Sequence, residues 1–198
     1  MRMEQGIIFD LENVLLTIDI DENAKNRLVY DFLRERKYLF HPDDLKGKTP
    51  LEFAASLSCW HEHDGEILEQ EIGKFERKVM LEAKCDSSAP GVLSMLSLRY
   101  RLVVLSRSRG DGIVKALGNA GIRQFFDFIV PGEKWVGHPS RTVGLELAME
   151  KYPEISKEQW CYVGAPPSRE AAVQCGLRFY AFGDPPLEEL EDLMDILL

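Results

Sequence analysis

The stretch GIIFDLENVLL, residues 6–16, joins the pattern of a buried strand to two closely spaced carboxylates. The apolar run 7–9 ends at Asp10, and Glu12 follows two residues later, before a second apolar segment. An ionised carboxylate at the tip of a buried strand is costly unless it is paired, hydrogen-bonded or bound to a metal. The stretch therefore predicts a candidate active site at the carboxyl end of the first strand.

The composition is that of an ordinary globular protein, with 198 residues, of which 45% are hydrophobic and 29% charged. This length suits one well-buried domain, or one domain that carries an insertion. Acidic residues outnumber basic ones by 33 to 24, which gives a net charge of -9. Non-specific binding to nucleic acid or to an anionic membrane needs clustered positive charge, so we expect neither partner.

The sequence also predicts a cytoplasmic protein. No apolar run approaches the roughly 20 residues that span a bilayer, and the first residues lead into a strand without a signal-peptide pattern. The four cysteines are scattered, without the spacing of a disulfide framework or a zinc site. We expect them to be reduced thiols.

The first and last parts of the chain alternate short apolar runs with amphipathic stretches. The runs at 6–9, 101–105, 126–130, 160–163 and 178–182 read as buried strands, and helical patterns begin near 91, 112, 141 and 168. Strand followed by helix, repeated, implies right-handed crossovers and a parallel sheet. We therefore expect an α/β fold, a Rossmann-like parallel sheet of about five strands sandwiched by helices.

The segment between the first strand and residue 89 breaks this alternation, because it is too long for an ordinary crossover. Leu68, Ile72, Phe75 and Val79 repeat at helical spacing within it. We interpret residues 17–88 as an inserted α-helical cap subdomain, and residues 1–16 with 89–198 as the Rossmann-like core domain. Open parallel sheets bind ligands beyond the carboxyl ends of their strands, which is where Asp10 lies.

Four segments carry a resemblance to a known family, in the expected order and spacing. They are FDLENVLL (9–16), LVVLSRS (102–108), GEKWVGHPS (132–140) and YVGAPPSREAAVQCG (162–176). Together they resemble the motifs of the haloacid dehalogenase-like (HAD) superfamily, in its phosphoglycolate-phosphatase-like branch with a helical cap. The resemblance covers nearly the whole chain and implies the same fold.

The resemblance also implies catalytic roles. Asp10 matches the nucleophile that forms an aspartyl phosphate, and Ser106 matches the hydroxyl that holds the phosphoryl group. Glu12 stands at the acid/base position, where the family has an aspartate, so its carboxylate is moved by one methylene. His138 stands at the position of the family's lysine, and a neutral imidazole cannot replace an ammonium.

The family's Mg²⁺ site is the least preserved part. By the resemblance, Asp10, the position of Glu12 and an acid of the fourth motif hold the metal. Here that motif reads Gly164-Ala165-Pro166, without its acids. Glu170 is the candidate replacement ligand, with Asp184 as a second. Each also has an ordinary structural interpretation: Glu170 as a solvated residue in the first turn of a helix, and Asp184 as a turn residue. Mg²⁺ is thus a possible cofactor with a weakened site.

Four further residues are candidate contacts for a phosphorylated small molecule. Asn13 lies within the first motif, directly after Glu12, and Arg107 follows Ser106, while Lys134 and Arg107 could stand in for the missing lysine. Lys48 lies in the cap segment, where a solvated lysine is an equally good interpretation. The chain is expected to be a monomer or a homodimer.

Two functions remain open. The first is a phosphatase-like protein that has lost, or strongly reduced, Mg²⁺-dependent activity and binds a phosphorylated ligand or a partner. The second is an active, divergent phosphomonoester phosphatase that works through an aspartyl-phosphate intermediate at Asp10. We favour the first, because charge-stabilising groups act as a unit and several are replaced together.

Overall fold

The computed structural model describes residues 5–18, 21–135, 141–185 and 187–198. The chain divides into two units, Met1–Ile18 with Met80–Leu198 and the inserted Asp19–Val79. The strands are β1 (Gln5–Asp10), β2 (Leu16–Thr17), β3 (Lys84–Cys85), β4 (Tyr100–Leu105), β5 (Phe128–Val130), β6 (Trp160–Gly164) and β7 (Arg178–Ala181). The α-helices are α1 (Glu22–Glu35), α2 (Pro50–Ala55), α3 (Asp64–Leu81), α4 (Ala89–Leu96), α5 (Gly110–Asn119), α6 (Thr142–Glu150), α7 (Arg169–Gln174) and α8 (Asp192–Leu197). Short 3₁₀ turns are η1 (Pro42–Leu45), η2 (Arg123–Phe125), η3 (Gly132–Lys134), η4 (Lys157–Gln159) and η5 (Pro166–Ser168).

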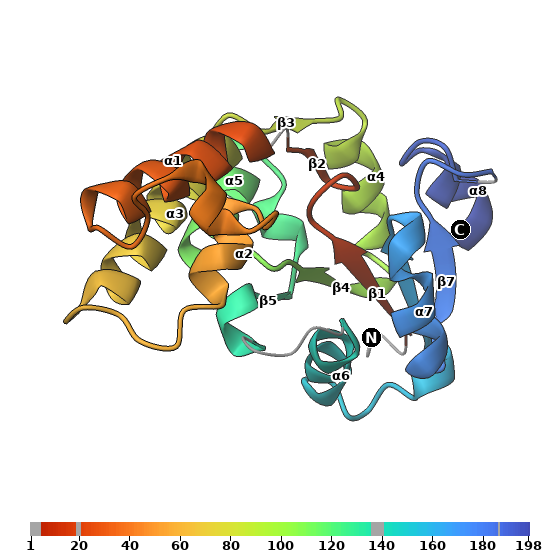
Figure 1. Ribbon diagram of the computed structural model, residues 1–198. Coiled ribbons are helices and arrows are strands. Elements are labelled where there is room, and N and C mark those ends of the chain that lie inside the picture. Colours follow the sequence, from red (N-terminus) through yellow and green to blue (C-terminus); the bar gives the residue numbers. More distant parts are fainter. Residues whose placement is uncertain (1–4, 19–20, 136–140, 186) are drawn as a thin grey trace. The chain divides into compact units, whose positions relative to one another are not determined.

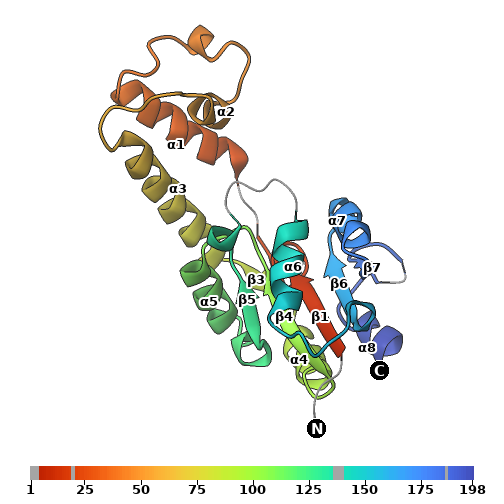
Figure 2. The same cartoon turned by 90° about the horizontal axis from the view of Figure 1, so that it is seen from below.

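The first unit is built on a five-stranded sheet in the order β5-β4-β1-β6-β7, and every neighbouring pair of strands is parallel. This order can be followed across the sheet in Figure 2. The expected Rossmann-like α/β fold, with about five parallel strands and flanking helices, is confirmed. Because β1 lies at the centre, Asp10 ends a strand that has a partner on both sides.

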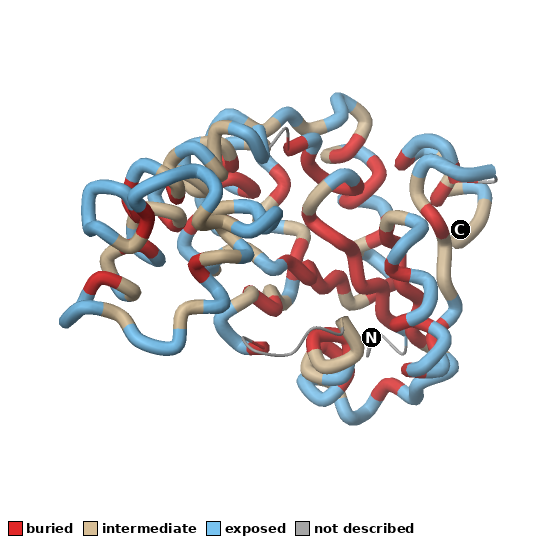
Figure 3. The backbone as a smooth tube through the Cα atoms, in the orientation of Figure 1, coloured by how far each residue is buried: buried red, intermediate tan, exposed pale blue. Residues whose placement is uncertain are grey.

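Side chains alternate between the two faces of each strand. One face carries Ile8, Val103 and Tyr162, which pack with residues of α6 and α7 in a single buried cluster. Helices α6 and α7 contact each other, and α4 contacts α8. The strands β1, β4 and β6 run through the buried centre of this unit (Figure 3). Burial on both faces explains why their sequences are continuous apolar runs rather than alternating ones.

Strand β5 is shorter than the predicted 126–130 and begins only at Phe128. Just before it, the Asp127 N–H donates to the Leu102 carbonyl at 2.9 Å, and the Asp127 carboxylate accepts a hydrogen bond from the Leu102 N–H at 3.1 Å. The Asp127 side chain also pairs with Arg101 at 2.7 Å. The carboxylate therefore takes the place of a ladder bond at this end of the strand.

The inserted unit is helical and has its own buried cluster, centred on Val29, Leu33, Leu39 and Leu68. Helix α1 begins at an Asp21 cap, and α2 begins at a Thr49 capping box. A buried Asp64 at the start of α3 pairs with Arg36 at 2.5 Å. In the described part of the chain, no helix has the length and apolar character to cross a membrane.

Candidate functional site

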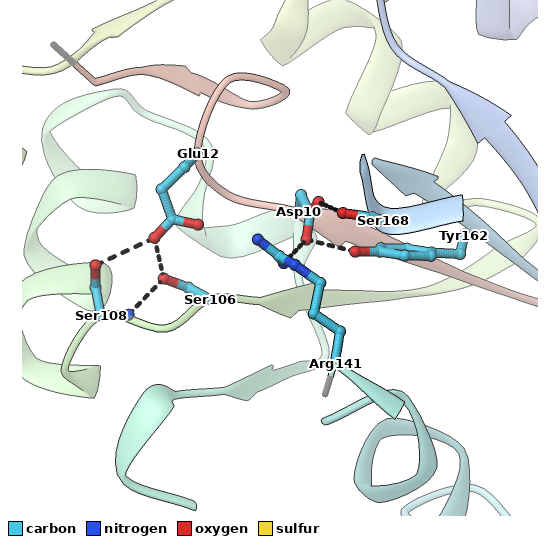
Figure 4. A network of polar contacts seen from close by, with 7 residues as sticks. All are labelled: Asp10, Glu12, Ser106, Ser108, Arg141, Tyr162 and Ser168. Atoms are coloured by element: carbon cyan, nitrogen blue, oxygen red, sulfur yellow. Dashed lines mark hydrogen bonds and ion pairs between the residues drawn. The ribbon is translucent and has the colours of Figure 1, made fainter. Parts of the chain in front are cut away.

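Asp10 lies at the carboxyl end of β1 and is only 1% exposed. Its Oδ1 accepts hydrogen bonds from the guanidinium of Arg141 and from the Tyr162 hydroxyl, the latter at 2.7 Å. Its Oδ2 accepts a bond from the Ser168 hydroxyl at 3.1 Å. Figure 4 shows the three side chains converging on this one carboxylate. The buried charge is therefore met by one cation and two hydroxyl donors.

The sheet register explains how the Asp10 cluster forms. Tyr162 pairs with Ile8 across β1 and β6, and Ile8 and Asp10 point to the same face of β1. The phenol of Tyr162 therefore lies beside Asp10, on the face that α6 and α7 cover. Arg141 immediately precedes α6, and Ser168 immediately precedes α7. Two crossover connections thus deliver both remaining partners to the same carboxylate.

The protonation states follow from burial and from these contacts. Burial raises the pKa of Asp10, against the opposing effects of Arg141 and the hydroxyl donors. Burial disfavours the charge of Arg141, but Asp10, Tyr162 and Glu12 together outweigh this effect and raise the pKa of Arg141. Burial, with the neighbouring Asp10, raises the pKa of Tyr162 far above its usual range. Arg141 is held as a cation and Tyr162 as a neutral donor.

A second cluster forms around Glu12, just past the end of β1. Its Oε1 accepts hydrogen bonds from the hydroxyls of Ser106 and Ser108, the latter at 3.1 Å. The fully buried Ser106 hydroxyl in turn accepts a bond from the Ser108 N–H at 3.0 Å. The charge of Glu12 also acts to raise the pKa of Asp10. Asp10, Glu12 and Ser106 therefore lie at one edge of the sheet, although their catalytic roles stay predictions.

A pocket of about 650 Å³ opens at this edge of the first unit. It is lined by two arginines, by η5 and by one side of α7: Arg107, Arg141, Ala165, Pro167, Ser168, Glu170, Ala171 and Gln174. The Arg107 guanidinium carbon lies 5.2 Å from the centre of the Trp135 ring, so the side chain is packed against an aromatic face. Glu170 is exposed in the first turn of α7 and accepts a hydrogen bond from Gln174 at 3.2 Å.

Four predicted residues differ in what the structure shows of them. Asn13 is exposed, with a φ of 60°, and its N–H bonds Leu16 in the turn after β1. Lys134 is exposed on η3, Lys48 belongs to the inserted unit, and His138 falls outside the described residues. Of the two that the structure describes in the first unit, neither Asn13 nor Lys134 lines the pocket.

The residues at this edge do not fit an octahedral Mg²⁺ ion. Such an ion takes six oxygen ligands, usually including carboxylates with free lone pairs. The Oδ1 of Asp10 already accepts bonds from Arg141 and Tyr162, and position 165 is an alanine. The exposed Asp184 lies in a turn closed by the Leu187 N–H at 2.8 Å. Among the described residues, no three His, Cys, Asp or Glu side chains form a metal-binding group.

The sequence interpretation missed Arg141, Tyr162, Ser168 and Ser108. Tyr162 could have been identified from the sequence, since a tyrosine within a buried strand needs a hydrogen-bond partner for its hydroxyl. Its spacing two residues before Gly164 puts that hydroxyl near the carboxyl end of β6. Arg141 gave a weaker signal, because an arginine that opens a helix is normally solvated.

Comparisons with known proteins support the same fold. No protein-family model and no curated protein sequence matches the chain. Among solved structures, a predicted phosphoglycolate phosphatase from Haemophilus somnus aligns over 100% of both chains, with a TM-score of 0.68 and 14% identity. A phosphatase candidate from Clostridium difficile aligns over 100% of both chains, with a TM-score of 0.67 and 15% identity.

A further structural neighbour is the HAD-hydrolase candidate YfnB from Bacillus subtilis, whose structure contains magnesium. It aligns over 99% of both chains, with a TM-score of 0.63 and 20% identity. At such low sequence identities, structural similarity shows a shared fold and does not show a shared activity. The chain therefore has the fold of the haloacid dehalogenase-like hydrolases.

Proposed function

We propose that this protein binds a phosphorylated small molecule at the carboxyl edge of its sheet and lacks efficient Mg²⁺-dependent phosphatase activity. The observation that carries the proposal is the state of the Asp10 carboxylate, both oxygens of which accept hydrogen bonds from within the protein. A nucleophile must direct a lone pair at phosphorus. A charged donor on Oδ1 lowers the reactivity of that oxygen.

The positive charge at the edge supports a binding role. Arg107 and Arg141 line the same pocket, and contact with Asp10 keeps Arg141 charged. Guanidinium groups match the oxygens of a phosphate in a two-bond geometry, which makes arginine well suited to phosphate recognition. In a magnesium-dependent phosphatase the metal supplies much of this charge. We infer that the arginines supply it here.

The alternative is an active, divergent phosphatase. It is favoured by the shared location of Asp10, Glu12 and Ser106, which are the residues that resemble the nucleophile, the acid/base and the phosphoryl-binding hydroxyl. For activity, the Asp10 carboxylate would have to exchange Arg141 for substrate or metal. The two functions therefore differ in what Asp10 does when a ligand enters.

The first experiment measures hydrolysis of an aryl phosphate, with and without Mg²⁺, by the wild type and by Asp10→Asn purified identically. We expect equal, negligible rates for both proteins in both conditions. Turnover that requires Mg²⁺ and is lost in Asp10→Asn would overturn the proposal in favour of the active phosphatase.

The second experiment measures binding of inorganic phosphate by titration calorimetry. Charge-assisted hydrogen bonds are worth about 1.5–3 kcal/mol, so Arg141→Gln should weaken binding roughly 10- to 100-fold. Arg109→Gln is the matched control, because Arg109 is exposed in the same loop as Arg107 and does not line the pocket. Equal losses in both variants, or no phosphate binding by the wild type, would contradict the binding role.

A further inference from the structure

The pocket beside Asp10 is larger than a phosphate group and is not uniform in charge. A cavity of about 10–15 Å³ already holds one water, whereas the pocket measures about 650 Å³, far more than a single phosphate group can fill. It therefore has room for the organic part of a phosphate ester. The walls around that space determine which organic part fits.

Two kinds of polar group line the pocket. Arg107 and Arg141 are cations, while Glu170 and Gln174 belong to α7. The amide of Gln174 donates to Glu170 at 3.2 Å, which holds the carboxylate in place along the helix. Carboxylate oxygens have several lone-pair positions, so Glu170 can still accept bonds from ligand hydroxyls. The pocket thus offers donors for an anion and acceptors for hydroxyl groups.

The carboxylate of Glu170 also repels a second negative group. Like charges held several ångströms apart near a protein surface cost about 1 kcal/mol or more, depending on the effective dielectric constant. A ligand that carries a phosphate and a carboxylate would place its second anion in a pocket where Glu170 is already negative. A ligand whose organic part bears hydroxyl groups would instead donate hydrogen bonds there.

We propose that Glu170 makes this pocket selective for phosphate monoesters of neutral polyols over phosphorylated acids. The inference rests on the proposed phosphate-binding function and adds the class of ligand and the residue that selects it. It gives Glu170 a role that does not depend on a metal ion.

The test uses two probes that differ at one carbon, glycerol 3-phosphate with a hydroxymethyl group and 3-phosphoglycerate with a carboxylate. Titration calorimetry measures both against the wild type, Glu170→Gln, Glu170→Asp and the control Glu150→Gln. Glu150 is exposed at the end of α6 and does not line the pocket, so its variant reproduces the change in net charge alone. Inorganic phosphate is titrated alongside.

We expect the wild type to bind glycerol 3-phosphate about tenfold more tightly than 3-phosphoglycerate, in line with one screened like-charge repulsion. Glu170→Gln should remove that preference, while Glu170→Asp and Glu150→Gln should keep it. An unchanged preference in Glu170→Gln would overturn the role of Glu170, with phosphate binding left intact. Failure of inorganic phosphate itself to bind would instead remove the proposed function and this inference with it.

Discussion

Arg141 and Asp10 form an ion pair in which the carboxylate is 1% exposed and the arginine side chain 24% exposed. Removing one partner of such a pair leaves the other as an uncompensated charge, which is far costlier than losing the pair as a whole. If Arg141 is removed, the Tyr162 and Ser168 hydroxyls can still donate hydrogen bonds to Asp10, but they cannot supply a positive charge. The stability of this edge of the sheet therefore depends on the Arg141 side chain.

We expect Arg141→Gln to lower the free energy of unfolding by about 3 kcal/mol when Asp10 is present. In the Asp10→Asn background the same substitution should cost only about 1 kcal/mol, because no buried charge is left unpaired. Urea denaturation of the four proteins gives the coupling energy between the two sites. Additive effects would mean that the contact contributes nothing to stability.

The pH dependence of Arg141→Gln has a definite sign. Burial raises the pKa of Asp10 from its ordinary 3.8, and Arg141 opposes that rise; without Arg141 the pKa should rise further. When the pKa of a carboxyl is higher in the folded state than in the unfolded state, folding is not penalised below the unfolded pKa, where the group is protonated in both states. Stability is lost as the pH rises from there through the folded-state pKa. Urea denaturation should therefore show a larger loss at pH 7 than at pH 4. A loss that is greater at pH 4 would contradict this account of Asp10.

At the scale of elements, the loop after β4 and the turn η3 are held together by close backbone approach. Gly132 donates its N–H to the carbonyl of Ser108 at 2.9 Å. A Cβ at position 132 would lie 1.9 Å from the carbonyl oxygen of Arg107. Only glycine lets η3 pack here, and this packing helps to fix the loop that carries Ser106 and Arg107.

Gly132→Ala should destabilise the protein by about 1–3 kcal/mol, the usual range for overpacking. Gly118→Ala is a control of opposite sign, because Gly118 lies in α5 with no atom within 4 Å of an added Cβ. It should stabilise by about 0.5–1 kcal/mol through lower conformational entropy of the unfolded chain. Thermal melts give the change in melting temperature of each variant. Equal changes in both would show that the close backbone approach at Gly132 does not affect stability.

The elements were more predictable from sequence than the contacts between them. Runs such as Ile7–Phe9 and 101–105 are apolar because both faces of the sheet are covered, and that pattern is local. The same reasoning placed Asp10 and Ser106 at strand ends. Arg141 and Ser168 are far from Asp10 in the sequence. They contact it only because the connections before α6 and α7 pass over the end of β1, and the local sequence pattern does not reveal that path. His138 fitted a motif position, whereas the cation found on Asp10 is Arg141.

At the scale of the whole molecule, the free thiols report on the integrity of the sheet. Cys59 is exposed in the inserted unit, whereas Cys161 lies within β6 and is 6% exposed. Burial raises the pKa of Cys161 to about 12. At pH 8 only about one such thiol in ten thousand is ionised, and the thiolate is the reactive form.

A disulfide reagent at pH 8 should therefore modify Cys59 within the mixing time and Cys161 only as the first unit unfolds. Peptide mass mapping over time identifies which thiol has reacted, and Cys59→Ser should remove the fast phase alone. In urea the Cys161 phase should accelerate in step with unfolding. Rapid modification of Cys161 in the native protein would show that β6 opens without global unfolding.

The central position of β1 has a consequence for synthesis on the ribosome. Its two neighbours begin only at Tyr100 and Trp160, so this buried strand leaves the ribosomal exit tunnel long before either partner has been synthesised. The helical segment 19–79, with its own buried cluster, can fold during that delay. The rate of translation between β1 and β4 thus determines how long β1 remains without a partner strand.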